Sequence, residues 1–396
     1  MVTRFSHLYQ IYQRFISDLD SQISRFPAIP RIDMEELEHL EKSSTSVLYG
    51  AGRLGELSAN LLPKYFDYIC DSSLFALQRF PRNLISDSVE IDNLINIDSQ
   101  IIVYISITKS HFSSIVQRLK EKNPKNRIFH IYDLLAIKTS GVFDNFWTVD
   151  LWSKGIEAKV LEVFTKLSDI VSRSHYLAFL IWHVEGLDAY DILSRPFLAS
   201  DSAVDYFAGL PETILNKKLS DLNILDVGSS DDSFIVNISK YFPCIGLKIK
   251  QFDPLEGHQS VLPHKLVNKS LVENSHFNYA LTFERGEVGF NSQLGMASRI
   301  NHDGNSRVTC FQIDDFGMYF DIIKIHVEGS EVSVLEGARQ TLRLKPLMVF
   351  VTVYHNSDGI YLIETFLQEI LGDGYDYYFH NHGYSGVASI FKAIRK

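Results

Sequence analysis

Short apolar runs alternate with amphipathic stretches between residues 46 and 131. The predicted strands are residues 46–49, 66–70, 101–107 and 127–131, with one helix that follows the first strand and ends at Leu62 and another at residues 111–122. Strands that alternate with helices usually pair in parallel. This pattern predicts a small Rossmann-like α/β domain at residues 43–140.

Helical spacing prevails on both sides of this domain. Apolar positions three and four apart over residues 4–26 predict an amphipathic helix that packs on its own domain or pairs with a second copy in a homodimer. Two prolines and the acidic stretch 35–41 then predict a linker, so that residues 1–42 are helix and linker. Residues 141–220 are predicted to be a helical connecting segment.

The alternation of strands and helices returns over residues 221–396, which we expect to be a further α/β domain. The predicted strands are residues 223–227, 246–252, 321–328, 347–354, 375–380 and 388–394, and a helix is predicted at residues 332–342. The last two strands are close enough in sequence to form a terminal hairpin.

Composition narrows the classes of function. A chain of 396 residues with 45% apolar and 22% charged residues suggests two or three globular domains. A net charge of −10 argues against a nucleic-acid partner, and no apolar run is long enough to predict a membrane span. The polar N-terminus does not resemble a signal peptide, and Cys70, Cys244 and Cys310 are far apart, so we expect reduced thiols in a cytoplasmic protein.

A glycine-rich turn follows the first predicted strand. Gly50, Gly52 and Gly55 have the spacing of a dinucleotide-binding loop, and Asp71 ends the next strand, where an acid holds ribose hydroxyls. One reading is therefore a second site for a nucleotide or nucleotide-sugar, or for NAD in an oxidoreductase. The other is a turn that serves only packing, because a 90-residue unit is half of a dinucleotide domain and no catalytic set accompanies it.

Two acids end the first two strands of the C-terminal region. Asp226 leads into Gly228, and Asp253 follows the second strand. In a nucleotide-binding α/β fold the first acid lies near the ligand, and the second accepts hydrogen bonds from both ribose hydroxyls. This spacing by itself is compatible with several nucleotide-binding folds.

Ionisable residues alternate with apolar ones in the strand at residues 321–328. Lys324, His326 and Glu328 are predicted on one strand face, and Glu331 follows shortly after. Ionisable groups on a mid-sheet strand are costly unless they are paired or line a cavity. They either pair among themselves for structure or mark a site at the carboxyl end of the strand, where ligands bind in such sheets.

The C-terminal region resembles the FkbM-type methyltransferases, over roughly residues 160–396. The resemblance rests on the run from Ile323 to Glu331, on Val334–Ala338, on Pro346, and on the upstream motifs Asp226–Gly228, Phe252–Pro254 and Asp314–Asp315. It implies a class I (Rossmann-like) methyltransferase domain with a seven-stranded, mostly parallel sheet that ends in an antiparallel hairpin. It also implies S-adenosylmethionine as cofactor, bound through Asp226, Gly228, Ser229 and Asp253, and methyl transfer to a hydroxyl of a sugar, glycan or secondary metabolite.

Three positions depart from the pattern of that family. Asp232 replaces the last glycine of the cofactor loop, His326 replaces an aspartate, and Asp253 is shorter than the usual glutamate. The first two changes raise an alternative, in which the domain is inactive and binds a nucleotide-sugar or glycan.

The catalytic hypothesis centres on a base that takes the proton of the acceptor hydroxyl. His326 is the predicted base, Glu328 and Glu331 orient it or accept the proton, Lys324 completes the polar set, and His355 bonds the acceptor. No metal is expected, although His326 and Glu328 with Asp315 form an alternative ligand set. His380 and His382 have ligand-like spacing, but we interpret them as the exposed end of the hairpin.

Overall fold

The computed structural model describes two compact units. The described residues are 32, 34–71, 77–78, 80, 85–87, 101–106, 112–139, 156–185, 189–194, 205–215, 219, 221–229, 232–243, 246–255, 266–267, 270–382 and 388–396. Those up to 139, with 177–185 and 189–194, belong to the first unit, and the others belong to the second. The described part of the helical segment predicted at residues 141–220 is therefore shared between the two units.

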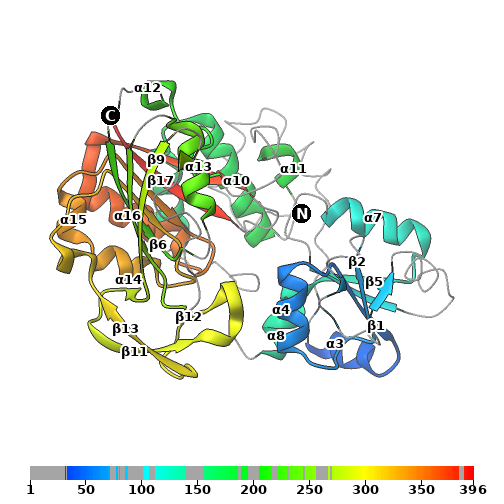
Figure 1. Cartoon of the computed structure of the whole chain (residues 1–396). Coiled ribbons are helices and arrows are strands. Elements are labelled where there is room, and N and C mark those ends of the chain that lie inside the picture. Colours follow the sequence, from blue (N-terminus) through cyan, green and yellow to red (C-terminus); the bar gives the residue numbers. More distant parts are fainter. Residues whose placement is uncertain are drawn as a thin grey trace. The chain divides into compact units, whose positions relative to one another are not determined.

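The first unit is built on a five-stranded sheet in the order β3-β2-β1-β4-β5, and all of its strand pairs are parallel (Figure 1). The strands are β1 (Thr45–Tyr49), β2 (Tyr68–Asp71), β3 (Ile85–Asp87), β4 (Ile101–Ile105) and β5 (Arg127–His130). The helices are α3 (Met34–Glu41), α4 (Arg53–Leu61), α7 (Phe112–Lys122), α8 (Ile131–Lys138) and α11 (Tyr190–Leu193). Every residue of β4 is buried, as expected for a strand with a neighbour on each side.

The linker predicted up to residue 42 is wrong in its described part, because Met34–Glu41 form helix α3. Glu35 and Glu36 occupy the first turn, where negative charge stabilises the helix dipole, and Leu37 and Leu40 are buried. The acidic composition that suggested a linker is therefore the solvent side of a short amphipathic helix. The helix predicted at residues 4–26 lies outside the described residues.

The second unit contains an eight-stranded sheet in the order β16-β17-β15-β14-β6-β7-β9-β8. The strands are β6 (Asp221–Val227), β7 (Gly246–Phe252), β8 (Leu266–Val267), β9 (Ser270–Phe277), β14 (Ile322–Ile325), β15 (Met348–Thr352), β16 (Tyr375–Asn381) and β17 (Ser389–Arg395). The pairs from β15 to β9 are parallel, and β17 is antiparallel to both neighbours. The mixed α/β fold with seven mostly parallel strands is confirmed, and the two-residue strand β8 adds an eighth at the edge.

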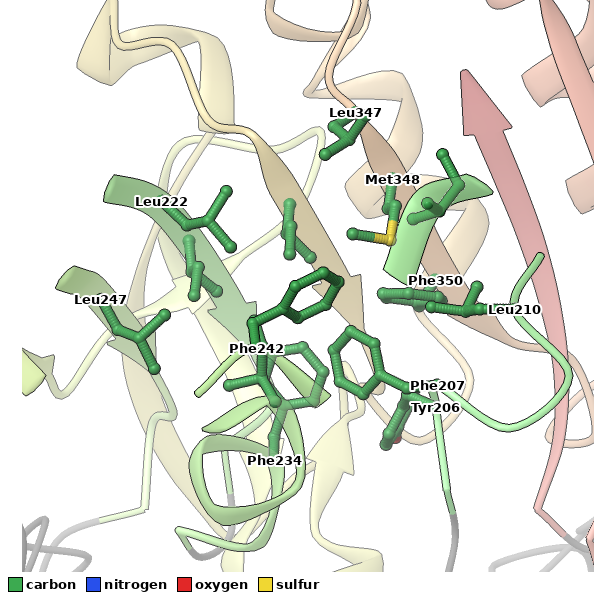
Figure 2. Close-up of a cluster of buried hydrophobic side chains, with 14 of the residues drawn as sticks. Tyr206, Phe207, Leu210, Leu222, Phe234, Phe242, Leu247, Leu347, Met348 and Phe350 are labelled. Carbon is green, nitrogen blue, oxygen red and sulfur yellow. The ribbon is translucent and has the colours of Figure 1, made fainter. Parts of the chain in front are cut away.

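The second unit also contains α-helices and short 3-10 helices. They are α9 (Ile156–Lys166), the first part of α10 (Ile170–Glu185), α12 (Glu212–Leu215), α13 (Ser233–Tyr241), α14 (Glu331–Glu336), α15 (Arg339–Arg343), α16 (Gly359–Leu371) and the 3-10 helices η3 (Ser292–Ala297), η4 (Ile313–Phe316) and η5 (Gly372–Gly374). Figure 2 shows the core beneath α13, where Phe207, Phe234 and Phe350 meet side chains of β6 and β7.

The single helix predicted at residues 332–342 is two helices, α14 and α15. Gly337 separates them, and a side chain at this position would approach Thr282 O to within 2.6 Å. The carboxylate of Asp314 accepts hydrogen bonds from Gln340 N at 2.9 Å and Thr341 N at 2.8 Å, so it caps α15.

A separate four-stranded sheet, absent from the prediction, lies in the chain between β9 and β14 (yellow in Figure 1). Its strands are β10 (Ala280–Leu281), β11 (Gly286–Asn291), β12 (Arg299–Ile300) and β13 (Ser306–Phe311). Two of these strands have only two residues, which is too short to give a recognisable periodic pattern. This sheet supplies one wall of the site described next.

Candidate active site

An open cleft lies at the carboxyl ends of β6, β7 and β14. Its lining residues come from these strand ends and from the small inserted sheet: Val227, Gly228, Phe252, Asp253, Pro254, Leu255, Tyr279, Ala280, Leu281, Phe290, Ser298, Arg299, Ile300, His326, Val327 and Glu328. The carboxyl ends of parallel strands are where ligands bind in open α/β sheets. The lining is mostly apolar, with the polar groups concentrated at Asp253, Arg299, His326 and Glu328.

Gly228 makes the sharp turn after β6. Its φ is +75°, and a Cβ atom at this position would lie 1.7 Å from His326 O. Its N–H donates to Phe252 O at 2.8 Å. Only glycine fits here, because both its left-handed backbone and the close passage of the chain after β14 exclude a side chain.

Asp253 lies at the end of β7 and lines the cleft. One of its carboxylate oxygens accepts a hydrogen bond from Leu255 N at 2.9 Å, which fixes the side chain. Ser229, beside Gly228, is buried, and its hydroxyl has no hydrogen-bond partner among the described residues. Asp232 is the residue directly before the first turn of α13, without a side-chain capping bond, and does not appear in the described lining of the cleft.

Asp226 and Lys324 lie beneath the cleft and not in its described lining. Lys324 Nζ forms a buried ion pair with Asp226 Oδ1 at 2.8 Å and donates to Gly228 O at 2.7 Å. Gln251 Nε2 donates to the other oxygen of Asp226 at 3.1 Å. The structure thus gives these two predicted site residues a supporting role, in which they hold the turn at Gly228.

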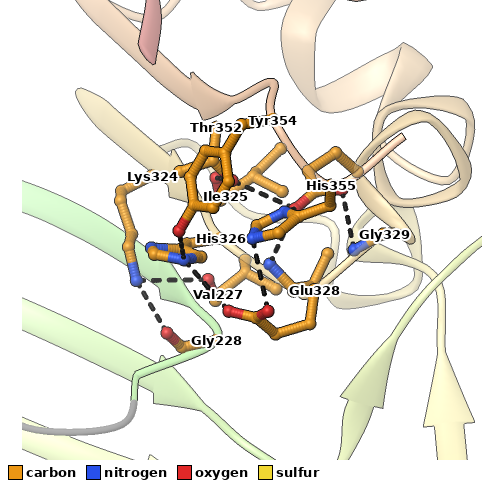
Figure 3. Close-up of polar contacts among 12 residues, drawn as sticks. Val227, Gly228, Lys324, Ile325, His326, Glu328, Gly329, Thr352, Tyr354 and His355 are labelled. Atoms are coloured by element: carbon orange, nitrogen blue, oxygen red, sulfur yellow. Dashed lines mark hydrogen bonds and ion pairs between the residues drawn. The ribbon is translucent and has the colours of Figure 1, made fainter. Parts of the chain in front are cut away.

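His326 and Glu328 reach the cleft from a loop, and this corrects the predicted arrangement. Strand β14 ends at Ile325, so the single polar strand face from Lys324 to Glu328 does not exist. Glu328 has φ +54°, a left-handed conformation that costs a non-glycine residue roughly 1–2 kcal/mol, and Gly329 follows at +110°. The strained turn directs the Glu328 carboxylate toward two histidines (Figure 3).

Glu331 holds that turn in place. Its carboxylate accepts hydrogen bonds from Val327 N at 3.1 Å and Gly329 N at 3.0 Å, and from Thr352 Oγ1 at 3.0 Å. It is also 2.6 Å from His355 Nδ1. Glu331 is buried and fully engaged, so its observed role is to position the loop and His355.

His355 lies between two carboxylates. Its Nδ1 meets Glu331, and its Nε2 lies 3.3 Å from Glu328 Oε2. Burial by itself would lower the pKa of His355, but the charges and hydrogen bonds of Glu328 and Glu331 outweigh burial and raise the pKa to about 10. His355 is therefore a cation at neutral pH in this arrangement.

His326 differs from His355 in its charge. Burial lowers the pKa of His326, which the Glu328 carboxylate only partly offsets, so its imidazole is neutral at pH 7. Its Nε2 lies 3.2 Å from Glu328 Oε1. Burial would raise the pKa of Glu328, but the His355 charge and bonds from both imidazoles lower it, and the carboxylate stays ionised.

Two tyrosines that were not predicted as site residues complete the surroundings of His326. Tyr206 Oη is hydrogen-bonded to His326 Nδ1 at 2.9 Å, and Tyr354 Oη to Nε2 at 3.1 Å. Tyr354 ends the strand that was predicted at residues 347–354 and directly precedes His355, so its place in the sequence could have marked it as a site residue. Tyr206 comes from 120 positions upstream, and only the tertiary fold brings it to His326.

Two predictions about metal ligands are corrected. Asp315 does not join His326 and Glu328, because its carboxylate pairs with Arg285, with Oδ1 2.6 Å from the guanidinium. His380 is not at an exposed hairpin end, because its side chain is buried, and burial lowers its pKa well below the usual value.

The predicted nucleotide loop of the first unit lies between β1 and α4. Gly50 has φ +112°, so its backbone conformation favours glycine, and a Cβ at Gly55 would lie 2.0 Å from Gly50 O, so packing requires glycine there. Gly52 has open space at its Cβ position. Asp71 Oδ2 accepts a hydrogen bond from Ala51 N at 2.6 Å, so this carboxylate braces the loop. The nucleotide hypothesis for this unit stays a prediction.

No helix among the described residues is long and apolar enough to cross a membrane. No curated protein matches the sequence. The fold is similar to that of the solved methyltransferase FkbM from Methylobacillus flagellatus KT, with a TM-score of 0.60 at 15% identity, covering 97% of this chain and 99% of that one. At that identity the similarity shows the fold alone.

Sequence comparison identifies the C-terminal part of the chain. The methyltransferase FkbM domain family matches residues 219–385, which hold the described lining of the cleft and the cluster of His326, Glu328 and His355. The resemblance predicted from the run Ile323–Glu331 is therefore confirmed. Residues 219–385 of this chain match the methyltransferase FkbM domain family.

Proposed function

We propose that the second unit transfers a methyl group from S-adenosylmethionine to a hydroxyl of a sugar, glycan or related secondary metabolite. The observation that carries the proposal is the cleft, which has Gly228 and Asp253 on one side and His326 and Glu328 on another. Asp253 has the position to accept hydrogen bonds from the ribose hydroxyls of the cofactor. The turn at Gly228 lets the backbone approach the cofactor closely.

The transfer is an in-line displacement, in which the bond from the acceptor oxygen to the methyl carbon forms as the sulfur–methyl bond breaks. S-adenosylhomocysteine leaves, and the hydroxyl proton must go to a base. The neutral imidazole of His326 and the ionised carboxylate of Glu328 line the cleft and can receive it. Glu331, His355 and Lys324 support these groups and the loop that carries them.

Calorimetric titration of the full chain with S-adenosylmethionine and S-adenosylhomocysteine tests the cofactor. We expect one site per chain, and Asp253→Ala is expected to weaken binding by about 1–3 kcal/mol through lost hydrogen bonds. The matched control is Asp303→Ala, an exposed aspartate outside the described lining of the cleft. Absence of heat with both compounds would contradict the proposal.

The same titration separates the rival functions. Heat with nucleotide-sugars but none with S-adenosylmethionine would favour an inactive binding domain, which the unusual Asp232 and His326 suggested. Heat with NAD that depends on Asp71 would favour a nucleotide site in the first unit. A screen of hydroxylated sugars for methyl transfer then identifies the acceptor.

A further inference from the structure

Two histidines and one glutamate of the cleft form a set with the composition of a metal site. His326, Glu328 and His355 each offer one ligand atom, and these atoms lie within 4.8 Å of one another. The imidazole Nε2 atoms lie 3.2 Å and 3.3 Å from the Glu328 carboxylate oxygens. Ligands of a tetrahedral zinc ion, with bonds of about 2.0–2.1 Å, are separated by roughly 3.3 Å. Both imidazole–carboxylate spacings match that separation, and the cluster, whose ligand atoms lie within 4.8 Å of one another, would contract around an ion.

We propose that His326, Glu328 and His355 bind a divalent transition-metal ion at the wall of the cleft. Two imidazoles and a carboxylate are ligands that zinc, iron, cobalt and manganese accept. The alternative is that the three side chains serve only as a buried ion-pair network, which the experiment below separates from a metal site.

The surroundings of the cluster orient it as the outer shell of a metal site does. The Nδ1 atom of His355 is bonded to the Glu331 carboxylate, which leaves Nε2 directed at Glu328. The Nδ1 atom of His326 is bonded to the Tyr206 hydroxyl, and its Nε2 faces Glu328 at 3.2 Å and the Tyr354 hydroxyl at 3.1 Å, a bond that an ion would replace. Metal-binding histidines characteristically use their second nitrogen in this way.

The charges of the cluster also suit a divalent ion. Glu328 and Glu331 carry two negative charges, and in the metal-bound form both imidazoles are neutral. A doubly charged ion therefore balances the buried carboxylates. The neighbouring pair of Lys324 and Asp226 is already balanced by itself.

The site is open on the side of the proposed substrate. His326 and Glu328 line the cleft, whereas His355 lies behind them and outside the described lining. Three protein ligands leave coordination positions for the oxygens of an acceptor. A bound ion would lower the pKa of an acceptor hydroxyl, whose proton would pass to solvent water, and in that form His326 would be a ligand and not the base. This step rests on the proposed methyl transfer, and it favours acceptors with two adjacent hydroxyls that can bind the ion together.

Cobalt titration of the full-length, chelator-treated protein tests the site. We expect one Co²⁺ per chain by calorimetry, with visible absorption bands of a coordinated ion. His355→Gln and Glu328→Gln are each expected to lower Co²⁺ affinity at least about 100-fold, and Glu331→Gln about 10–100-fold through the lost outer-shell bond. The control is His302→Gln, an exposed histidine between β12 and β13.

Binding of S-adenosylhomocysteine, measured on the same samples, shows that each variant is folded and separates the two proposals. The metal site alone is overturned if the cofactor still binds but the wild type binds no Co²⁺. It is also overturned if the cofactor still binds and all variants have equal Co²⁺ affinity. Co²⁺ binding that His355→Gln and Glu328→Gln abolish supports it, even if no cofactor binds and the proposed function fails.

Discussion

At the residue scale, Gly228 is needed for the shape of the site, because only glycine lets the chain after β14 pass so close to the end of β6. We expect Gly228→Ala to destabilise the protein by more than about 2 kcal/mol and to abolish cofactor binding, because the new methyl group meets His326 O. Chemical denaturation and calorimetry would measure the two effects.

Gly317→Ala is the matched control for that substitution. Gly317 also has a positive φ, of +57°, but open space at the Cβ position, so only backbone strain of about 1–2 kcal/mol is expected. Equal losses of stability in the two variants would show that strain and not the contact with His326 makes Gly228 necessary.

At the scale of elements, a buried ion pair joins two neighbouring strands. Lys324 of β14 and Asp226 of β6 pair in register in the sheet, and their side chains form the ion pair beneath the cleft. Lys324→Met is expected to cost about 3–5 kcal/mol, because it leaves Asp226 charged, buried and without its cation.

The double variant Lys324→Met, Asp226→Asn tests this explanation. Removing the orphaned charge should recover part of the lost stability, as urea denaturation would show. If the double variant is as unstable as the sum of the single variants, the strands do not depend on the pairing of these charges.

At the scale of the whole molecule, a buried carboxyl couples stability to pH. Glu364 of α16 has no hydrogen-bond partner for either oxygen among the described residues, and burial raises its pKa to about 7. Lys166 lowers that pKa and Glu162 raises it, both from α9, while Tyr377 of β16 is the further titratable group near it.

A raised pKa in the folded state means that protonation favours folding. Protonation of Glu364 contributes fully to the free energy of unfolding below pH 4.5. This contribution, about 3 kcal/mol in total, is lost as the pH rises through 7. Glu364→Gln should remove this loss. In denaturation experiments, the free energy of unfolding of the variant should therefore rise relative to that of the wild type between pH 4.5 and 8. Glu287→Gln, at an exposed position, is the control, and parallel pH profiles of wild type and Glu364→Gln would refute the explanation.

Local pattern was enough to predict much of the second unit. Four of the five strands that pair in parallel (β9 was not predicted), the terminal hairpin, the turn at Gly228 and the position of Asp253 follow from periodicity, glycine geometry and acids at strand ends. Each of these features depends on residues near one another in sequence, where backbone preference and side-chain burial act together. The run Ile323–Glu331 likewise identified the family.

Only the tertiary structure decided which predicted side chains meet the cleft and which support it. The sequence alternation places Lys324 and His326 on the same strand face. In the structure, Lys324 forms an ion pair with Asp226 beneath the cleft, while His326 lies after the end of β14 and lines the cleft. His355 became part of the site because Glu331 and Glu328, 24 and 27 positions away, surround it. The charge state and role of an ionisable side chain are set by such distant partners, because burial and neighbouring charge decide them and neither is encoded in local pattern.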